Sequence, residues 1–328
     1  MGIFVVACQS NPEQNFASQS SATETENCRV VEHDAGEIEI CGQPQTVAAL
    51  SPRVLDPMLA LGVQPAAYAE GRLLNFDRFD NPSEQIPYLG DLITTQPINL
   101  GDRLNPSLET LVKVKPDLIV GTDFRDYDLF SKIAPTLVVA NAASPDGWSR
   151  RLQVIAQVFG KEERSEQVIA EYEQYLAEVQ EKLAPILATN PRVLPIYPHQ
   201  GGTIGVESYT SDAAALLEAV GFQLVLLDEF PQRTLDVRPQ ISVETLPQLD
   251  PDMIFVLSVD GDNFYDPKPA AQRLWNDNPV LKNLRASQER HVYFVNSRIW
   301  GGRLSGPIAY GHMLDELPDL LLPLVEEK

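Results

Sequence analysis

The chain has few histidines and cysteines and no long apolar run. Among 328 residues there are only four histidines and three cysteines. The histidines are scattered without the spacing of convergent ligands, so we expect no protein-ligated metal and no metal-binding residues. No segment beyond the N-terminal residues approaches the roughly 20 apolar residues that a membrane span needs.

Basic residues are also scarce. Lysine and arginine total 25 against 46 acidic residues, a formal net charge of −21. This balance argues against a nucleic-acid partner, which needs a basic surface. It does not exclude an anionic small ligand, because local charge and not total charge defines a site. Arginine makes up 17 of the 25, and its planar fork matches pairs of carboxylate-type oxygens.

The common catalytic motifs are absent. The sequence contains no G-x-S-x-G, no C-x-x-C and no H-E-x-x-H, which are the short signatures of hydrolases, redox proteins and metalloproteases. We therefore expect no catalytic residues, no bound cofactor and no enzymatic activity.

The N-terminus resembles the lipobox of a bacterial lipoprotein. Val5-Val6-Ala7 precedes Cys8, and residues 9–27 are rich in Ser, Gln, Asn, Thr and Glu. In a lipoprotein Cys8 would carry the lipid, and the polar run would serve as a tether at the cell envelope. The usual basic region and long apolar core of a leader are missing, so an ordinary apolar N-terminus is the alternative.

The other two cysteines bracket a predicted hairpin. Cys28 and Cys41 flank two alternating runs around Asp34-Ala35-Gly36, so their side chains should lie opposite each other. A disulfide there would contribute about 3 kcal/mol in the chain-entropy model and would indicate an oxidising compartment. Two free thiols are the alternative.

One stretch of sequence occurs twice, 135 residues apart. Arg103 to Val120 reads R-L-N-P-S-L-E-T-L-V-K-V-K-P-D-L-I-V, and Arg238 to Phe255 reads R-P-Q-I-S-V-E-T-L-P-Q-L-D-P-D-M-I-F. An ungapped match of this length indicates two related lobes. Each copy places a serine suited to cap a helix two residues before a glutamate. Pro247 predicts a shorter or irregular helix in the second copy.

Strand-like and helix-like segments alternate through both lobes, which predicts an α/β fold with a central parallel sheet in each Rossmann-like lobe. The longest helical pattern covers Ser165 to Ala184 and should end at Pro185. We expect this helix to join the lobes. The predicted division is 1–27 (leader remnant and tether), 28–147 (N-terminal lobe), 148–187 (linking helices) and 188–328 (C-terminal lobe).

Two α/β lobes, one bridging helix and a repeated [S]-[LV]-E-x-L…P-D-x-I element resemble the siderophore and cobalamin substrate-binding lipoproteins of ABC importers, the helical-backbone class. In that family the glutamate of each copy pairs with arginines of the membrane permease. The resemblance assigns this docking role to Glu109 and Glu244. The alternative is that both carboxylates only stabilise the starts of their helices.

In related proteins the residue six positions before each glutamate lines the ligand cleft and is often aromatic. Here both are arginines, Arg103 and Arg238. Two guanidinium forks from opposite lobes favour an anionic ligand, although two surface salt bridges are the alternative. Loops after predicted strands supply the other candidate ligand residues: Arg53, Arg125, Tyr127, Tyr197, Trp300 and Arg303.

The expected function is capture of an iron(III)-siderophore in the periplasm and its delivery to an ABC permease. A citrate- or hydroxamate-type chelate is the first expectation and a catecholate the second. The ligand would bring its own iron coordination, and the protein would act as a lipid-anchored monomer. Cobalamin or haem binding is the alternative within the fold, and a metallocluster- or chelatase-like enzyme is the distant one.

Overall fold

The computed structural model describes residues 28–70, 77–122, 127–139, 147–198, 203–207, 211–225, 239–258, 268–302 and 304–323. Four predicted site residues lie outside the described residues: Cys8, Arg125, Arg238 and Arg303.

The described chain begins with a two-stranded hairpin. Strands β1 (Cys28–His33) and β2 (Gly36–Cys41) pair antiparallel, with Cys28 opposite Cys41. A disulfide joins these two cysteines. Alternate side chains of the hairpin, among them Val31 and Ile40, are buried in the largest core cluster.

The N-terminal lobe has a five-stranded sheet in the order β5-β4-β3-β6-β7, and all of its pairings are parallel. Its strands are β3 (Val47–Ala49), β4 (Ala67–Glu70), β5 (Ile98–Asp102), β6 (Leu118–Gly121) and β7 (Thr136–Val138). Its helices are α1 (Pro52–Ala60), α2 (Pro82–Gln85), η1 (Gly90–Leu92), α3 (Leu108–Val114) and α4 (Tyr127–Phe130).

The C-terminal lobe has a six-stranded mixed sheet. Strands β8, β10, β12 and β13 run parallel, whereas β9 pairs antiparallel with both β8 and β11. The strands are β8 (Arg192–Pro198), β9 (Thr203–Val206), β10 (Gln223–Leu224), β11 (Gln240–Ser242), β12 (Met253–Ser258) and β13 (Val292–Asn296). The helices are α7 (Asp212–Val220), η2 (Val243–Thr245), α8 (Leu246–Leu249), α9 (Lys268–Asp277), α10 (Pro279–Lys282), α11 (Arg285–Gln288), α12 (Ser297–Trp300) and α13 (Pro307–Leu321).

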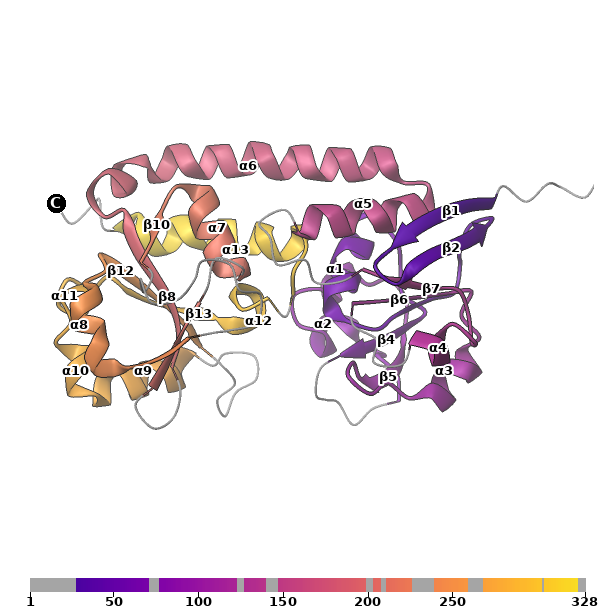
Figure 1. Ribbon diagram of the computed structural model, residues 1–328, viewed down its shortest axis with the longest axis horizontal. Coiled ribbons are helices and arrows are strands. Elements are labelled where there is room, and N and C mark those ends of the chain that lie inside the picture. Colours follow the sequence, from indigo (N-terminus) through magenta and orange to yellow (C-terminus); the bar gives the residue numbers. More distant parts are fainter. Residues whose placement is uncertain are drawn as a thin grey trace, which may run out of the picture.

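Two consecutive helices join the lobes. Helix α5 (Gly147–Phe159) leads into α6 (Glu162–Thr189), which runs along the top of both lobes in Figure 1. The α/β architecture with one long connecting helix is therefore confirmed. Among the described residues no helix combines the length and the apolar character needed to cross a membrane.

The predicted end of this long helix was wrong. Pro185 lies inside α6, which continues to Thr189. A proline removes one backbone hydrogen bond from the helix ladder. The next residue, Ile186, is buried in the main core, so its packing holds the last turn in place despite that loss.

The largest core cluster includes residues from both lobes and from α5, α6 and α13. Each lobe also has its own smaller cluster. That of the N-terminal lobe contains Leu111, and that of the C-terminal lobe contains Leu246. These leucines occupy the same position in the two copies of the repeated element.

Candidate functional site on the repeated element and at the lobe boundary

The first copy of the repeated element forms a capped α-helix. The Ser107 hydroxyl accepts a hydrogen bond from the backbone N–H of Thr110 at 3.2 Å, as expected of an N-cap. Glu109 follows in the first turn of α3. Its carboxylate is exposed and pairs with Lys113 at 2.7 Å, an i,i+4 pair that stabilises the helix only slightly at such exposure.

The second copy is less regular. It has the 3-10 turn η2 followed by the four-residue α8, with Pro247 at the start of α8. This confirms the effect predicted for the proline. The predicted cap by Ser242 was wrong: its hydroxyl caps no backbone N–H and instead donates to the carboxylate of Glu244. Glu244, like Glu109, is exposed.

The shared Pro-Asp pair explains what the element does in the fold. Asp117 accepts from the backbone N–H of Thr46 at 2.9 Å, and Asp252 accepts from that of Arg192 at 2.9 Å. Thr46 directly precedes β3, and Arg192 begins β8. Each copy therefore ties its helix to the amino end of a central strand and leaves its glutamate facing solvent.

A buried ion pair connects the two lobes. Glu70 ends β4 in the N-terminal lobe, and Arg298 follows β13 in the C-terminal lobe. The Arg298 Nη2 lies 3.3 Å from the Glu70 Oε1, with the two side chains only 3% and 5% exposed. The Tyr68 hydroxyl donates to the other carboxylate oxygen. Both residues lie at the carboxyl ends of parallel strands, where open α/β sheets bind ligands.

Further contacts cross the same boundary. The Asn296 Nδ2 donates to the Tyr88 hydroxyl at 2.8 Å, and the Arg53 Nε donates to the carbonyl oxygen of Gly302 at 2.6 Å. We use the term interlobe seam for the cross-lobe pairs Glu70–Arg298, Tyr88–Asn296 and Arg53–Gly302.

The seam gathers positive charge from both lobes. Burial and the neighbouring Glu70 raise the pKa of Tyr68 well above its usual value, while the positive charges of Arg298 and Arg103 oppose that shift. Arg103 is also held by its backbone, whose N–H donates to the carbonyl oxygen of Glu70 at 2.9 Å. Arg103 and Arg298, from opposite lobes, therefore both bond to Glu70.

Asp56 of α1 is a second buried carboxylate of the N-terminal lobe that bonds to the C-terminal lobe. It accepts hydrogen bonds at 3.0 Å from the backbone N–H groups of Ile308 and Ala309 in the first turn of α13. Burial raises the pKa of Asp56 to about 7, although both hydrogen bonds act in the opposite direction. This aspartate therefore caps a helix that begins 251 residues later in the sequence.

The other predicted ligand residues that the structure describes, Tyr197, Tyr127 and Trp300, lie in three different environments. Tyr197 is buried, and its hydroxyl lies against Gly301, where a Cβ would overlap with it. Tyr127 is partly exposed and packs near the hairpin, with its ring 6.0 Å from that of His33.

Trp300 belongs to the core. Its indole is fully buried, stacks on Phe255 at a centroid distance of 5.5 Å and donates to Glu316 at 2.8 Å. As placed, this side chain has no exposed surface to offer a ligand. The expectation that it packs against a ligand is corrected accordingly, because the core takes up the whole indole ring.

Sequence reasoning missed the residues that meet at the seam. Arg298, Glu70 and Tyr88 were not among the predicted site residues. The sequence did contain a signal for Arg298, because it follows the strand Val292–Asn296 at its carboxyl end. The same rule, that residues after strands line a ligand site, selected Arg53. For Glu70 and Tyr88 the pairing across the lobes cannot be read from local sequence.

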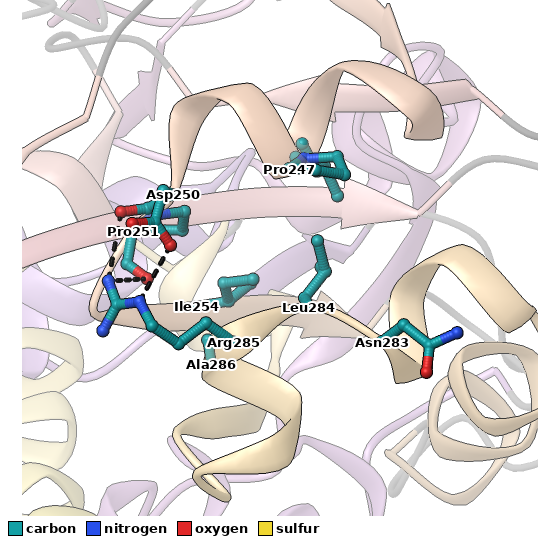
Figure 2. Close-up of a pocket in the computed structure, with 9 residues that line it drawn as sticks. Pro247, Asp250, Pro251, Ile254, Asn283, Leu284, Arg285 and Ala286 are labelled. Atoms are coloured by element: carbon teal, nitrogen blue, oxygen red, sulfur yellow. Dashed lines mark hydrogen bonds and ion pairs between the residues drawn. The ribbon is translucent and has the colours of Figure 1, made fainter.

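Two cavities formed by described residues lie on the C-terminal lobe, away from the seam. One, of about 200 Å³, adjoins the repeated element and includes Pro247 and Ile254 (Figure 2). At one end of it the Arg285 Nε lies 2.8 Å from Asp250 and its Nη2 lies 3.0 Å from Asp252. The other, of about 330 Å³, includes Trp275 and Phe294.

Comparisons with known proteins agree with this architecture. The chain is 24% identical over 303 residues to the Fe(3+)-citrate-binding protein YfmC of Bacillus subtilis, covering 91% of this chain and 87% of YfmC. It is 27% identical to the putative ABC transporter substrate-binding lipoprotein YhfQ of the same organism, with 97% and 94% covered. The crystal structure of the petrobactin-binding protein YclQ, also from Bacillus subtilis, superposes with a TM-score of 0.71 at 21% identity, covering 90% of this chain and 99% of that one.

A family model described as periplasmic binding protein matches residues 47–299, well over half of the chain. The family name and the lipoprotein names of relatives indicate a binding protein outside the cytoplasm. The chain belongs to the periplasmic binding protein family.

Proposed function

We propose that this protein captures an anionic iron(III)-siderophore outside the cytoplasm and delivers it to an ABC-importer permease. One observation carries the proposal: the partly exposed Arg103 follows β5 at its carboxyl end, and its backbone N–H donates to Glu70, the ion-pair partner of Arg298 from the opposite lobe. The names of relatives support it, since they include proteins that bind ferric citrate, ferric hydroxamate and petrobactin.

The chemistry follows from the guanidinium group. Its planar fork binds carboxylate oxygens through two parallel hydrogen bonds and stays charged at all physiological pH values. A citrate- or hydroxamate-type chelate is our first choice, and a catecholate is the second. The chelate supplies the iron coordination, so the protein contributes no iron ligand, holds no cofactor and performs no turnover. Further members of the proposed binding set are Arg53, Arg125, Tyr127, Tyr197, Arg238 and Arg303.

The proposal extends to the partners. Glu109 and Glu244, both exposed at the start of the repeated helix, would meet arginines of the permease. Cys8 would carry a lipid that holds the protein, as a monomer, at the cell envelope. A Glu109→Arg plus Glu244→Arg variant that still supports uptake would refute this docking assignment.

The test of the ligand is a titration panel. Purified protein is titrated with ferric citrate, a ferric hydroxamate, a ferric catecholate, cobalamin and haemin, and quenching of its tryptophan fluorescence is followed. We expect the tightest binding with one of the ferric chelates. Tight binding of cobalamin or haemin alone would overturn the proposal in favour of the alternative ligands.

Charge reversal tests the arginines. Arg103→Glu and Arg238→Glu should each weaken binding of the ferric chelate at least tenfold, since a repulsive carboxylate replaces an attractive cation. Arg78→Glu is the matched control, because Arg78 is exposed and its guanidinium group donates to the carbonyl oxygen of Gln96. Unchanged affinity in both reversed variants would contradict an anionic ligand held at this boundary.

A further inference from the structure

Exposed apolar side chains gather on one side of the N-terminal copy of the repeated element. Of the seven large hydrophobic residues that are exposed among the described residues, three lie four positions apart on α3 and the turn before it. They are Leu104, 62% exposed, Leu108, 37% exposed, and Val112, 54% exposed. We name these three residues the apolar ridge.

Helix geometry places the ridge beside the charged residues of α3. Successive residues of an α-helix are rotated by about 100°, so residues four apart share a face. Leu108 and Val112 therefore form one row, and Glu109 and Lys113 form a second row next to it. Leu111 lies opposite the Glu109–Lys113 row, next to the apolar row, and is fully buried. The helix thus shows solvent an apolar row and an ion-paired row side by side.

The second copy has no such ridge. Val243, which corresponds to Leu108, is only 5% exposed, whereas Pro247, which corresponds to Val112, is exposed and lines the cavity of Figure 2. The third equivalent position, that of Leu104, is held by Pro239. Neither the shared motif nor the fold of the helix therefore requires exposed leucines. Exposed apolar side chains that neither the motif nor the fold requires point to an interaction surface.

We propose that the apolar ridge is part of the permease docking surface, and that it enters an apolar groove of the permease whose rim carries cations. This inference rests on the proposed function. The permease is the chosen occupant because the ridge is continuous with the row of Glu109, the residue proposed to meet permease arginines. Carboxylate and apolar side chains on the same helix face fit a partner with basic groups around an apolar hollow.

The proposal makes docking unequal between the lobes. The N-terminal lobe presents a ridge beside its glutamate, whereas the C-terminal lobe presents Glu244 beside a hollow. Replacing an apolar side chain of the ridge with a polar one should then weaken binding more than the same substitution elsewhere on the surface.

The experiment uses the full chain with Cys8→Ser, so that no lipid contributes to binding. Right-side-out membrane vesicles of the source cells, washed free of the native protein, provide the permease. The triple variant Leu104→Gln, Leu108→Gln, Val112→Gln is compared with Leu274→Gln, whose side chain is 59% exposed on α9. We expect vesicle binding of the triple variant to fall at least tenfold, as in Glu109→Arg, while Leu274→Gln binds like the parent.

Three further measurements separate the alternatives. Equal vesicle binding by the triple variant and the parent overturns the proposal. Binding of the parent to protein-free phosphatidylglycerol vesicles that the triple variant loses would show a lipid partner and also overturn it. A dimer of the parent in sedimentation velocity that the triple variant lacks would show a second copy as the occupant.

The chelate titration keeps this inference separate from the proposed function. The triple variant should bind the ferric chelate within twofold of the parent, because the ridge lies on the outer surface of α3. A parent that binds no ferric chelate defeats the proposed function, yet the vesicle assay still decides whether the ridge docks. Circular dichroism and melting temperature confirm that all variants are folded.

Discussion

The two copies of the repeated element share their anchoring residues and differ in the surface they display. Leu111 and Leu246 are both fully buried, and Asp117 and Asp252 both tie their segment to a strand. Yet the first copy is a seven-residue capped helix and the second a 3-10 turn with a four-residue helix. Duplication preserved the attachment to the sheet, whereas the outward face of each copy diverged.

The largest expected effects test whether the anchors are equivalent. Leu111→Ala and Leu246→Ala should each lower the free energy of unfolding by about 2–5 kcal/mol, because each leaves a cavity in a lobe's own core cluster. Urea denaturation gives both values. A loss below 1 kcal/mol in only one copy would show that the two helices are not held in the same way.

Asp56 tests how strongly one lobe depends on the other, because it lies in the N-terminal lobe and caps α13. Its pKa is raised by burial from 3.8 to about 7, so the native state keeps a proton that the unfolded chain releases. The stability that this group contributes is complete below pH 4 and is lost as the pH rises through 7.

Asp56→Asn removes this titration. Between pH 5 and pH 8 the wild type should therefore lose on the order of 2–3 kcal/mol of unfolding free energy relative to the variant. Urea denaturation of both proteins at the two pH values measures the difference. Parallel pH profiles would mean that the carboxyl group titrates normally in the folded protein.

The strand ties should differ between the copies. Asp252→Ala removes the bond to the Arg192 backbone and also the ion pair with Arg285 at 3.0 Å, so we expect a loss of about 2–3 kcal/mol. Asp117 is exposed and, among the described residues, accepts from the backbone of Gln45 and Thr46, so Asp117→Ala should cost about 1–2 kcal/mol. Equal losses would show that the Arg285 pair contributes nothing to stability.

The smallest effect distinguishes the two serines. Ser107→Ala should destabilise the protein by about 1 kcal/mol, the usual cost of losing an N-cap. Ser242→Ala should change stability by only a few tenths of a kcal/mol, because its hydroxyl caps no backbone group. Melting temperatures of the two variants decide this, and a larger loss for Ser242→Ala would reverse the comparison.

Local sequence signals predicted much of the fold. The repeat, the hairpin with its paired cysteines and the shortening effect of Pro247 all depend on neighbours in sequence, and the structure has each of them. Pro185 and Trp300 were misread because tertiary packing decides both: Ile186 holds the helix past the proline, and the core takes up the indole. The Glu70–Arg298 pair joins residues 228 positions apart, which periodicity and spacing cannot reveal.

The main core cluster has a consequence for folding. Because it draws side chains from both sheets and from α5, α6 and α13, one face of each sheet is buried in a core that the two lobes share. The two lobes are separate as sheets but not as cooperative units. The protein should therefore melt in one transition, and a lobe expressed alone should remain unfolded.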